Sequence, residues 1–219
     1  MTPRFVPIAE HALLVEFGAR LSDEAHDRVL ALDAALSTAP FDGFIEAVPA
    51  FAAIMVEFDP AATTQADAVQ AITALLDHPA PRREGRLHEV SVCYDPDVEP
   101  DLQAVADATG LSTDAVINAH LDGDYQVAMY GFAPGYAYLS GVAEAIRLPR
   151  KPSAKRDVPA GSVLIAGGQC LVSTLTMPTG WWIIGRSPTA ILTGDEARPF
   201  LFDVGDRVRF RRIAREELR

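Results

Sequence analysis

The sequence MYGFAPGYAYLSG, in the second half of the chain, combines residue types that suit a ligand pocket. Gly131 and Gly135 permit backbone angles that side chains forbid, and with Pro134 between them the chain can turn sharply. The aromatic residues of this turn are Phe132, Tyr136 and Tyr138. Such rings either form the wall of a pocket for a flat ligand or fill a core, and both interpretations remain open.

Basic residues gather directly after this turn, in a chain that is otherwise acidic. They are Arg147, Arg150, Lys151, Lys155 and Arg156. A guanidinium binds a carboxylate or a phosphate through two parallel hydrogen bonds, and amides next to glycines add further donors. The segment is therefore either an anion-binding loop or a solvated basic loop. The neighbouring turn favours a pocket for a small anionic substrate, with Arg150 and Lys155 as its cations.

Histidine and tryptophan supply further candidate groups. His120 ends a predicted helix just before the strand that leads into the turn. It is a candidate for proton transfer, or else a surface histidine favoured by the helix dipole. Trp181 and Trp182 begin a predicted strand, so one ring is expected to face the core and the other a pocket or a partner. The histidines lack metal-ligand spacing and the sequence contains no GxSxG, GxxxxGK[ST] or HExxH motif, so we expect no metal bound by this chain alone.

Composition restricts the classes of protein to consider. The 219 residues include 19 Lys and Arg against 30 Asp and Glu, and the resulting net charge of -11 opposes binding to nucleic acid. The apolar stretches are far shorter than the roughly 20 residues that cross a bilayer, and the N-terminus lacks the features of a signal peptide. We therefore expect no membrane association and a cytoplasmic location, with Cys93 and Cys170 as buried, unpaired thiols.

The first half of the chain predicts strand, helix, strand, strand and helix, in that order. The predicted strands are 11–17, 44–48 and 53–58, and the predicted helices are capped by Ser22 and by Thr63 or Thr64. This order is that of a split β-α-β, ferredoxin-like α+β domain, which we assign to residues 1–80. Residues 81–87, at the end of a Pro- and Arg-rich stretch, are the predicted linker.

The second half, residues 88–219, changes character. Two short helices are predicted at 101–108 and 112–121, the second capped by Ser112, and strands at 88–94, 125–130, 162–166, 171–175, 181–184, 190–192 and 207–213. Many short strands with frequent Gly and Pro turn signals are typical of a closed or nearly closed β-structure. The elements that position the candidate residues are therefore expected to be strands of one barrel.

Several motifs follow one another in an order that resembles one family. They are HALLVEFG, VPAFAAIMVEFDP, YGFAPGYAYLSG, LPRKPS, VPAGSVLIAGGQ, PTGWWIIGRSP and VGDRVRF. The resemblance is to the family of allophanate hydrolase subunit 1 and the B subunit of 5-oxoprolinase, which also includes a sporulation-kinase inhibitor. It extends from about residue 5 to about residue 213. It implies an α+β fold, a small ferredoxin-like N-terminal domain followed by a cyclophilin-like β-barrel domain.

The resemblance also implies partners and a reaction. Members of this family work with a larger second subunit. The 5-oxoprolinase version adds a third subunit and uses ATP, with Mg²⁺, to hydrolyse 5-oxo-L-proline to L-glutamate. Two alternatives remain open: a component of an allophanate hydrolase or urea carboxylase-type carboxyltransferase, and a non-catalytic inhibitor of a histidine kinase. Of the three possibilities, we expect first that the chain is a 5-oxoprolinase subunit that is active only in the complex.

Site residues are carried over where this sequence matches the family. The expected substrate-binding residues are Gly131, Phe132, Pro134, Gly135, Tyr138, Gln169, Trp181 and Arg186, and the expected catalytic residues are His120, Arg150 and Lys155. Lys155 stands where arginine is usual and loses the bidentate fork. Ser173 replaces a tyrosine and Thr179 a glycine, both on the expected pocket side, so the substrate within the family stays open.

Overall fold

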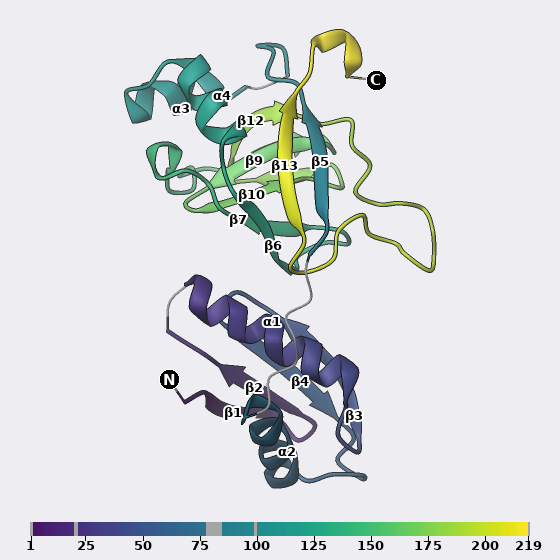
Figure 1. Ribbon diagram of the computed structural model, residues 1–219. Helices are drawn as coiled ribbons and strands as arrows, with labels where there is room; N and C mark the ends of the chain where they lie inside the picture. Colours follow the sequence, from purple (N-terminus) through teal and green to yellow (C-terminus); the bar gives the residue numbers. More distant parts are fainter. Residues whose placement is uncertain (1, 20–21, 78–84, 99, 219) are drawn as a thin grey trace. The chain divides into compact units, whose positions relative to one another are not determined.

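The computed structural model describes residues 2–19, 22–77, 85–98 and 100–218, and the chain divides into two compact units, Met1–Glu84 and Gly85–Arg219 (Figure 1). Residues 81–84 of the predicted linker lie outside the described residues. Leu87, at the end of the predicted linker, already belongs to strand β5. Each unit has its own core.

The first unit is a four-stranded antiparallel sheet with two helices. Its elements are β1 (Arg4–Ala9), β2 (Ala12–Glu16), α1 (Asp23–Thr38), β3 (Phe44–Pro49), β4 (Ala53–Phe58) and α2 (Gln65–Asp77). The sheet order is β1-β2-β4-β3. The sequence did not predict β1, which occupies the edge beside β2. In a ferredoxin-like chain order, the fourth strand follows the second helix. Here, β1 precedes the first helix instead.

Local sequence explains why the helices begin where they do and which faces they bury. The Ser22 hydroxyl accepts a hydrogen bond from the Ala25 amide at 3.1 Å, so the predicted N-cap of α1 is confirmed. Thr64 accepts from the Asp67 amide at the start of α2. Alternate residues of β2 and β4 are buried against both helices, as the period of a strand requires. One face of the sheet therefore carries the core of this unit.

The second unit is built mainly of strands. Its elements are β5 (Leu87–Val92), α3 (Leu102–Thr109), α4 (Thr113–Leu121), β6 (Tyr125–Tyr130), β7 (Ala137–Ser140), η1 (Glu144–Ile146), β8 (Lys155–Val158), β9 (Ser162–Ala166), β10 (Gln169–Val172), β11 (Met177–Thr179), β12 (Trp182–Arg186), β13 (Arg207–Arg212) and η2 (Arg215–Glu217). Ser112 caps α4 as predicted. The sequence missed β7, β8 and β11. The predicted strand 190–192 is wrong: Leu192 makes an isolated β-bridge with Phe200.

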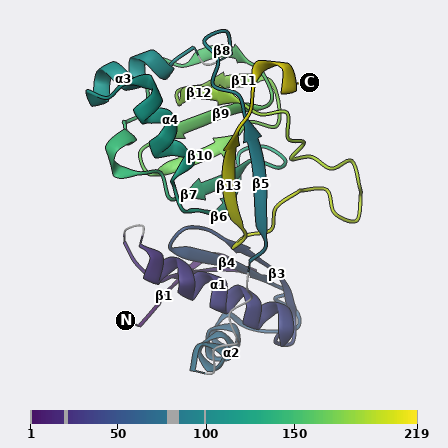
Figure 2. The same cartoon turned by 45° about the horizontal axis from the view of Figure 1, so that its top comes forward.

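Seven strands of this unit form one sheet that curls until its ends meet. The order is β12-β9-β10-β7-β6-β13-β5, with β13 parallel to β5. Just beyond β5, Cys93 exchanges two backbone hydrogen bonds of 2.8 Å with Arg186 of β12. The predicted nearly closed β-barrel is therefore confirmed. Helices α3 and α4 lie side by side next to it (Figure 2).

Alternation along the barrel strands produces two apolar clusters. Val163, Ile165 and Cys170 belong to the barrel core, whereas Leu164 and Leu171, which alternate with them, belong to a second cluster. Since successive side chains point to opposite faces of a sheet, the second cluster lies on the outer face. The ribbon of β8 and β11 contributes Val158 and Met177 to it, and the turn after β6 contributes Ala133 and Tyr136.

Candidate functional site

The turn predicted to shape the pocket joins β6 to β7. Three backbone hydrogen bonds hold it: Gly131 N–H to Tyr136, Ala133 N–H to Gly131 and Tyr136 N–H to Ala133, at 3.3, 2.9 and 3.0 Å. Gly135 has φ +69°, and a Cβ there would lie 2.7 Å from Cδ2 of Leu192. The backbone angle therefore favours glycine at this position, and a Cβ would displace the end of the Leu192 side chain.

The aromatic residues of the turn continue into a row of rings along the outer face. Ring centroids are 5.4 Å apart for Phe132 and Tyr136, 5.8 Å for Tyr136 and Tyr138, and 5.8 Å for Tyr138 and Trp181. These separations are those of favourable edge and tilted aromatic contacts. Tyr136 and Trp181 are buried, whereas Phe132 is 76% exposed. The prediction that one tryptophan ring faces a core is confirmed for Trp181.

Arg150 joins the end of this row. Its guanidinium carbon lies 5.7 Å from the centre of the Trp181 ring, at a cation–π distance, and its side chain is exposed. Burial raises the pKa of Tyr136 to about 12, and the positive charge of Arg150 acts in the opposite direction. The structure therefore brings Arg150 together with the turn, as the sequence predicted.

The other basic residues of the segment have different surroundings. Lys151 donates to the Asp101 carboxylate at 2.5 Å, and the same oxygen accepts from the Ile183 amide at 2.8 Å. Arg147 donates from Nε to the Val142 carbonyl at 2.8 Å. Lys151 and Arg147 thus hold the segment in place. This tether presents the neighbouring Arg150 above Trp181.

Lys155 and Arg156 lie on the exposed ribbon. Lys155 begins β8 and pairs with Thr179 of β11, and the Thr179 hydroxyl accepts from the Trp181 amide at 3.1 Å. Lys155 is therefore paired with Thr179, the residue whose hydroxyl binds the Trp181 amide. Arg156 follows Lys155 and points to the opposite side of the ribbon.

His120 lies inside the barrel core with no exposed surface. Its Nδ1 is 2.7 Å from the Tyr94 hydroxyl, its Nε2 is 3.5 Å from Sγ of Cys170, and its ring centroid is 4.4 Å from that of Phe210. Burial lowers the pKa of His120 to about 3. The alternative of a surface histidine is wrong. The geometry also gives no support to proton transfer to a substrate, because the ring has no access to solvent and stays neutral.

Two predicted binding residues lie away from the turn along their strands. Gln169 pairs with Ser140, at the end of β7 opposite to the turn. Arg186 provides the backbone pair with Cys93 that closes the barrel. The structure therefore brings together Gly131, Phe132, Pro134, Gly135, Tyr138, Trp181 and Arg150. Lys155 pairs with Thr179, two residues before Trp181, and Gln169 and Arg186 lie at other positions of the barrel sheet. Roles for these residues remain predictions.

The sequence positions Ser173 and Thr179 were expected on the pocket side. Ser173 is instead buried: its hydroxyl accepts from the Ser162 amide and donates to the Pro159 carbonyl, each at 3.0 Å. Thr179 is also buried and caps the Trp181 amide. Both hydroxyls bind backbone groups of neighbouring segments, so these two residues contribute to local structure and do not line a pocket. Asp101 was missed, because its contact with Lys151 joins positions that are 50 residues apart.

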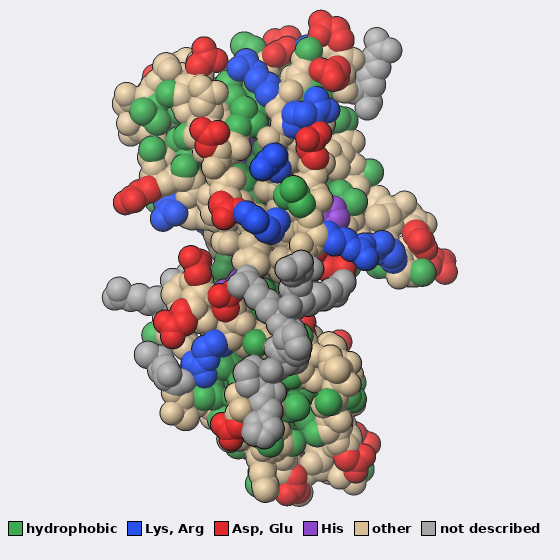
Figure 3. All heavy atoms as spheres, in the orientation of Figure 1, with side chains coloured by type: hydrophobic (Ala, Val, Ile, Leu, Met, Phe, Trp, Pro, Cys, Tyr) green, Lys and Arg blue, Asp and Glu red, His purple; other side chains and the backbone are tan. Residues whose placement is uncertain are grey.

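A second group of basic side chains lies along β13, and in Figure 3 acidic side chains lie among them. Arg207 pairs with Asp124 at 2.6 Å and Arg211 with Glu89 at 2.7 Å. These charges are exposed and mutually neutralised, so they add little to stability and form no anion site.

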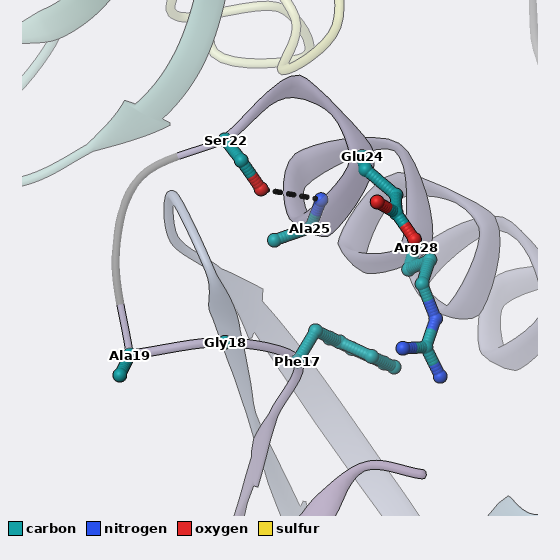
Figure 4. Close-up of a pocket in the computed structure, with 7 residues that line it drawn as sticks. All are labelled: Phe17, Gly18, Ala19, Ser22, Glu24, Ala25 and Arg28. Atoms are coloured by element: carbon teal, nitrogen blue, oxygen red, sulfur yellow. Dashed lines mark hydrogen bonds between the residues drawn. The ribbon is translucent and has the colours of Figure 1, made fainter. Parts of the chain in front are cut away.

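The first unit contains a separate hollow of about 320 Å³. It is lined by Phe17, Gly18, Ala19, Ser22, Glu24, Ala25 and Arg28 (Figure 4). Two of its polar side chains contact other groups of the chain: Ser22 caps α1, and the Arg28 guanidinium lies 4.6 Å from the centre of the Phe17 ring. We assign no ligand to this hollow.

Known proteins with similar sequences identify the family. The family model for the carboxyltransferase domain, subdomain C and D, matches residues 3–202. This chain belongs to that family. The B subunit of 5-oxoprolinase from Bacillus subtilis (strain 168) is 34% identical over 224 residues, covering 96% of this chain and 92% of the relative. The B subunit of 5-oxoprolinase from Escherichia coli O157:H7 is 32% identical, covering 93% of each. The family resemblance inferred from the motifs is confirmed.

Solved structures of other proteins share the fold of this chain. The protein TTHA0988 superimposes with a TM-score of 0.82 at 36% identity, covering 94% of this chain and 40% of that chain. The urea carboxylase of Kluyveromyces lactis has a TM-score of 0.76 at 15% identity, covering 99% of this chain and 22% of that enzyme, which shows a shared fold alone. This chain therefore corresponds to one part of both longer proteins. Within the described ranges, no helix is long and apolar enough to cross a membrane.

Proposed function

We propose that this chain is one component of an ATP-dependent 5-oxoprolinase, which hydrolyses 5-oxo-L-proline to L-glutamate together with a larger second subunit and a third subunit. The curated relatives that match along almost the whole chain are named as B subunits of 5-oxoprolinase. The observation in this chain that supports the proposal most is the Arg150 guanidinium above Trp181, at the end of the aromatic row. An ATP-consuming reaction also fits the cytoplasmic location expected from the sequence.

The reaction needs an activated lactam, because an unstrained lactam is a poor electrophile. The lactam carbonyl oxygen attacks the γ-phosphorus of ATP, so that a new P–O bond forms and ADP leaves. Water then adds to the carbonyl carbon, and the C–N bond breaks as nitrogen takes a proton, which leaves an acyl phosphate on the glutamate side chain. A second water attacks the carbonyl carbon of this acyl phosphate, and phosphate departs with the original oxygen. The products are glutamate, ADP and phosphate. A site for this reaction must hold a carboxylate and a phosphate close together.

The basic segment has groups for the carboxylate part of this task. We assign Arg150 to the substrate carboxylate, which it can bind through two hydrogen bonds, and Lys155 to a second anionic group. Tyr138, which is half-buried, provides an apolar surface near Arg150 for the five-membered ring, and the buried Trp181 supports both side chains. Gly131, Pro134 and Gly135 shape the turn that supports this wall.

We assign ATP and its Mg²⁺ to the complex rather than to this chain alone. Across the part of the chain that the structure describes, no three His, Cys, Asp or Glu side chains come close enough together to hold a metal ion. When bound, Mg²⁺ neutralises charge on the transferred phosphoryl group. The contribution of this chain is to bind and orient the lactam substrate.

Reconstitution tests this proposal. The chain, its second subunit and its third subunit are mixed with ATP, Mg²⁺ and 5-oxo-L-proline, and glutamate and ADP are measured over time. Equal amounts of both products, dependent on every subunit, are expected. Absence of glutamate with all subunits present and folded would reject the proposed function.

A further inference from the structure

The large exposed hydrophobic side chains of the second unit are not scattered evenly. Those that the structure describes are Leu87, Phe132, Leu175 and Leu192, with 63%, 76%, 42% and 37% of their surface exposed. Three of them lie around the turn between β6 and β7. We call Phe132, Pro134, Leu175 and Leu192 the turn patch.

Contacts within the chain show that the turn patch is continuous. The Thr174 hydroxyl donates to the Pro134 carbonyl at 2.7 Å, which brings the neighbouring Leu175 to the turn. Leu192 and Thr174 both border Gly135, at 2.7 and 3.2 Å from where a Cβ would stand. Residues from three separate segments thus meet at one Pro-Gly turn. The polar, exposed segment 193–199 follows Leu192, so the patch has a polar margin on that side.

Phe132 is unfavourable for the folding of the isolated chain in two respects. Its φ is +72°, in the left-handed region that bulky side chains disfavour, and its ring is mostly exposed to water. A glycine would adopt this angle without strain. Backbone strain of this kind is typical of binding sites, where the surroundings impose it. The two features together point to a ring that is buried by something outside this chain.

The ring of Phe132 is held ready for such a contact. It lies 5.4 Å from the buried Tyr136, and backbone hydrogen bonds of Gly131, Ala133 and Tyr136 fix the turn beneath it. Aromatic side chains that are fixed before binding are typical anchors of protein interfaces, because little side-chain freedom is lost on association.

We propose that the turn patch is the docking surface for the second subunit of the complex, with Phe132 as its central anchor. This inference rests on the proposed function. In TTHA0988 the region equivalent to this chain is 40% of one longer polypeptide, so it is covalently joined there to a remainder larger than itself. The aromatic row from Phe132 through Tyr138 and Trp181 to Arg150 links the patch to the proposed substrate site. A subunit docked on Phe132 therefore borders that site and completes it.

Binding measurements with the second subunit from the same organism test the proposal. Phe132→Gly removes the ring but suits the backbone angle, so the variant is expected to melt at or above the wild-type temperature while binding at least about tenfold more weakly. Leu192→Ser is expected to weaken binding in the same direction. Leu87→Ser removes an exposed leucine outside the patch and is expected to bind like the wild type.

The outcomes separate the docking surface from the enzymatic function. Wild-type affinity in both Phe132→Gly and Leu192→Ser, or no binding by the wild-type chain, would overturn the proposal. So would a wild-type homo-oligomer, seen by sedimentation without the second subunit, that Phe132→Gly dissociates, because the patch would then bind a second copy. A complex that depends on Phe132 but releases no glutamate supports the docking surface and rejects the proposed function.

Discussion

At the residue scale, the position of Arg150 above Trp181 distinguishes it from the other basic residues of its segment. Replacing Arg150 with alanine in the reconstituted complex is expected to raise KM for 5-oxoproline and to lower kcat/KM by about 10- to 100-fold, the effect of losing charge-assisted hydrogen bonds worth roughly 1.5–3 kcal/mol. Arg150→Lys retains the positive charge but loses the two parallel hydrogen bonds, so its kcat/KM should lie between those of the wild type and Arg150→Ala. The measurement is steady-state glutamate release.

Arg156 provides a matched control for this prediction. It comes from the same basic segment and is exposed, but it alternates with Lys155 on β8. Arg156→Ala is expected to leave KM unchanged. Equal kinetics for Arg150→Ala and Arg156→Ala would show that Arg150 does not bind the substrate.

His120 makes stability depend on pH, because burial lowers its pKa to about 3 from an ordinary value near 6.5. The unfolded chain therefore binds the proton more readily, and the stabilisation is complete above about pH 6.5 and is lost as the pH falls toward about 3. Denaturant unfolding should show up to about 2 kcal/mol lost between pH 7 and pH 5 from this residue. His120→Gln should flatten this part of the profile, and an unchanged slope in the variant would contradict the assignment.

At the element scale, the turn between β6 and β7 depends on Gly135 for two separable reasons, its backbone angle and the closeness of Leu192. Gly135→Ala is expected to destabilise the protein by roughly 1–3 kcal/mol in chemical denaturation. Gly167 is the control, since its φ is +56° and a Cβ there would meet nothing within 4 Å. Gly167→Ala measures the cost of the angle alone. Equal losses in both variants would mean that the contact with Leu192 relaxes freely.

The helices and strands differ in how well the sequence predicted them. Both helix caps and the strands with strong apolar patterns, such as 125–130 and 162–166, were predicted because their signals are local. Strand β8 was missed, since KRDV has a single apolar residue and gains its pairing from β11. The convergence of Arg150 with the turn followed from proximity in sequence. The burial of His120 was missed because β10 and β13, which supply Cys170 and Phe210, are remote in the chain.

At the scale of the whole molecule, the two compact units have separate cores, so the second unit is expected to fold by itself. A fragment of residues 85–219 should unfold cooperatively and bind the second subunit with the affinity of the full chain, since the turn patch and the aromatic row lie within it. Circular dichroism melting and binding measurements check this. Binding that requires residues 1–77 would show that the docking surface includes the first unit.

The boundary of that fragment can be tested as well, because the structure and the sequence disagree about where the second unit begins. The predicted start, residue 88, omits the Arg86 amide, which donates at 2.8 Å to the buried carboxylate of Asp206, and also Leu87, which pairs with Arg207. A buried acceptor that loses its donor costs roughly 1–3 kcal/mol. Residues 88–219 should therefore melt several degrees below residues 85–219. Identical melting temperatures would mean that water replaces the Arg86 amide without loss, and that the barrel is complete from His88 onward.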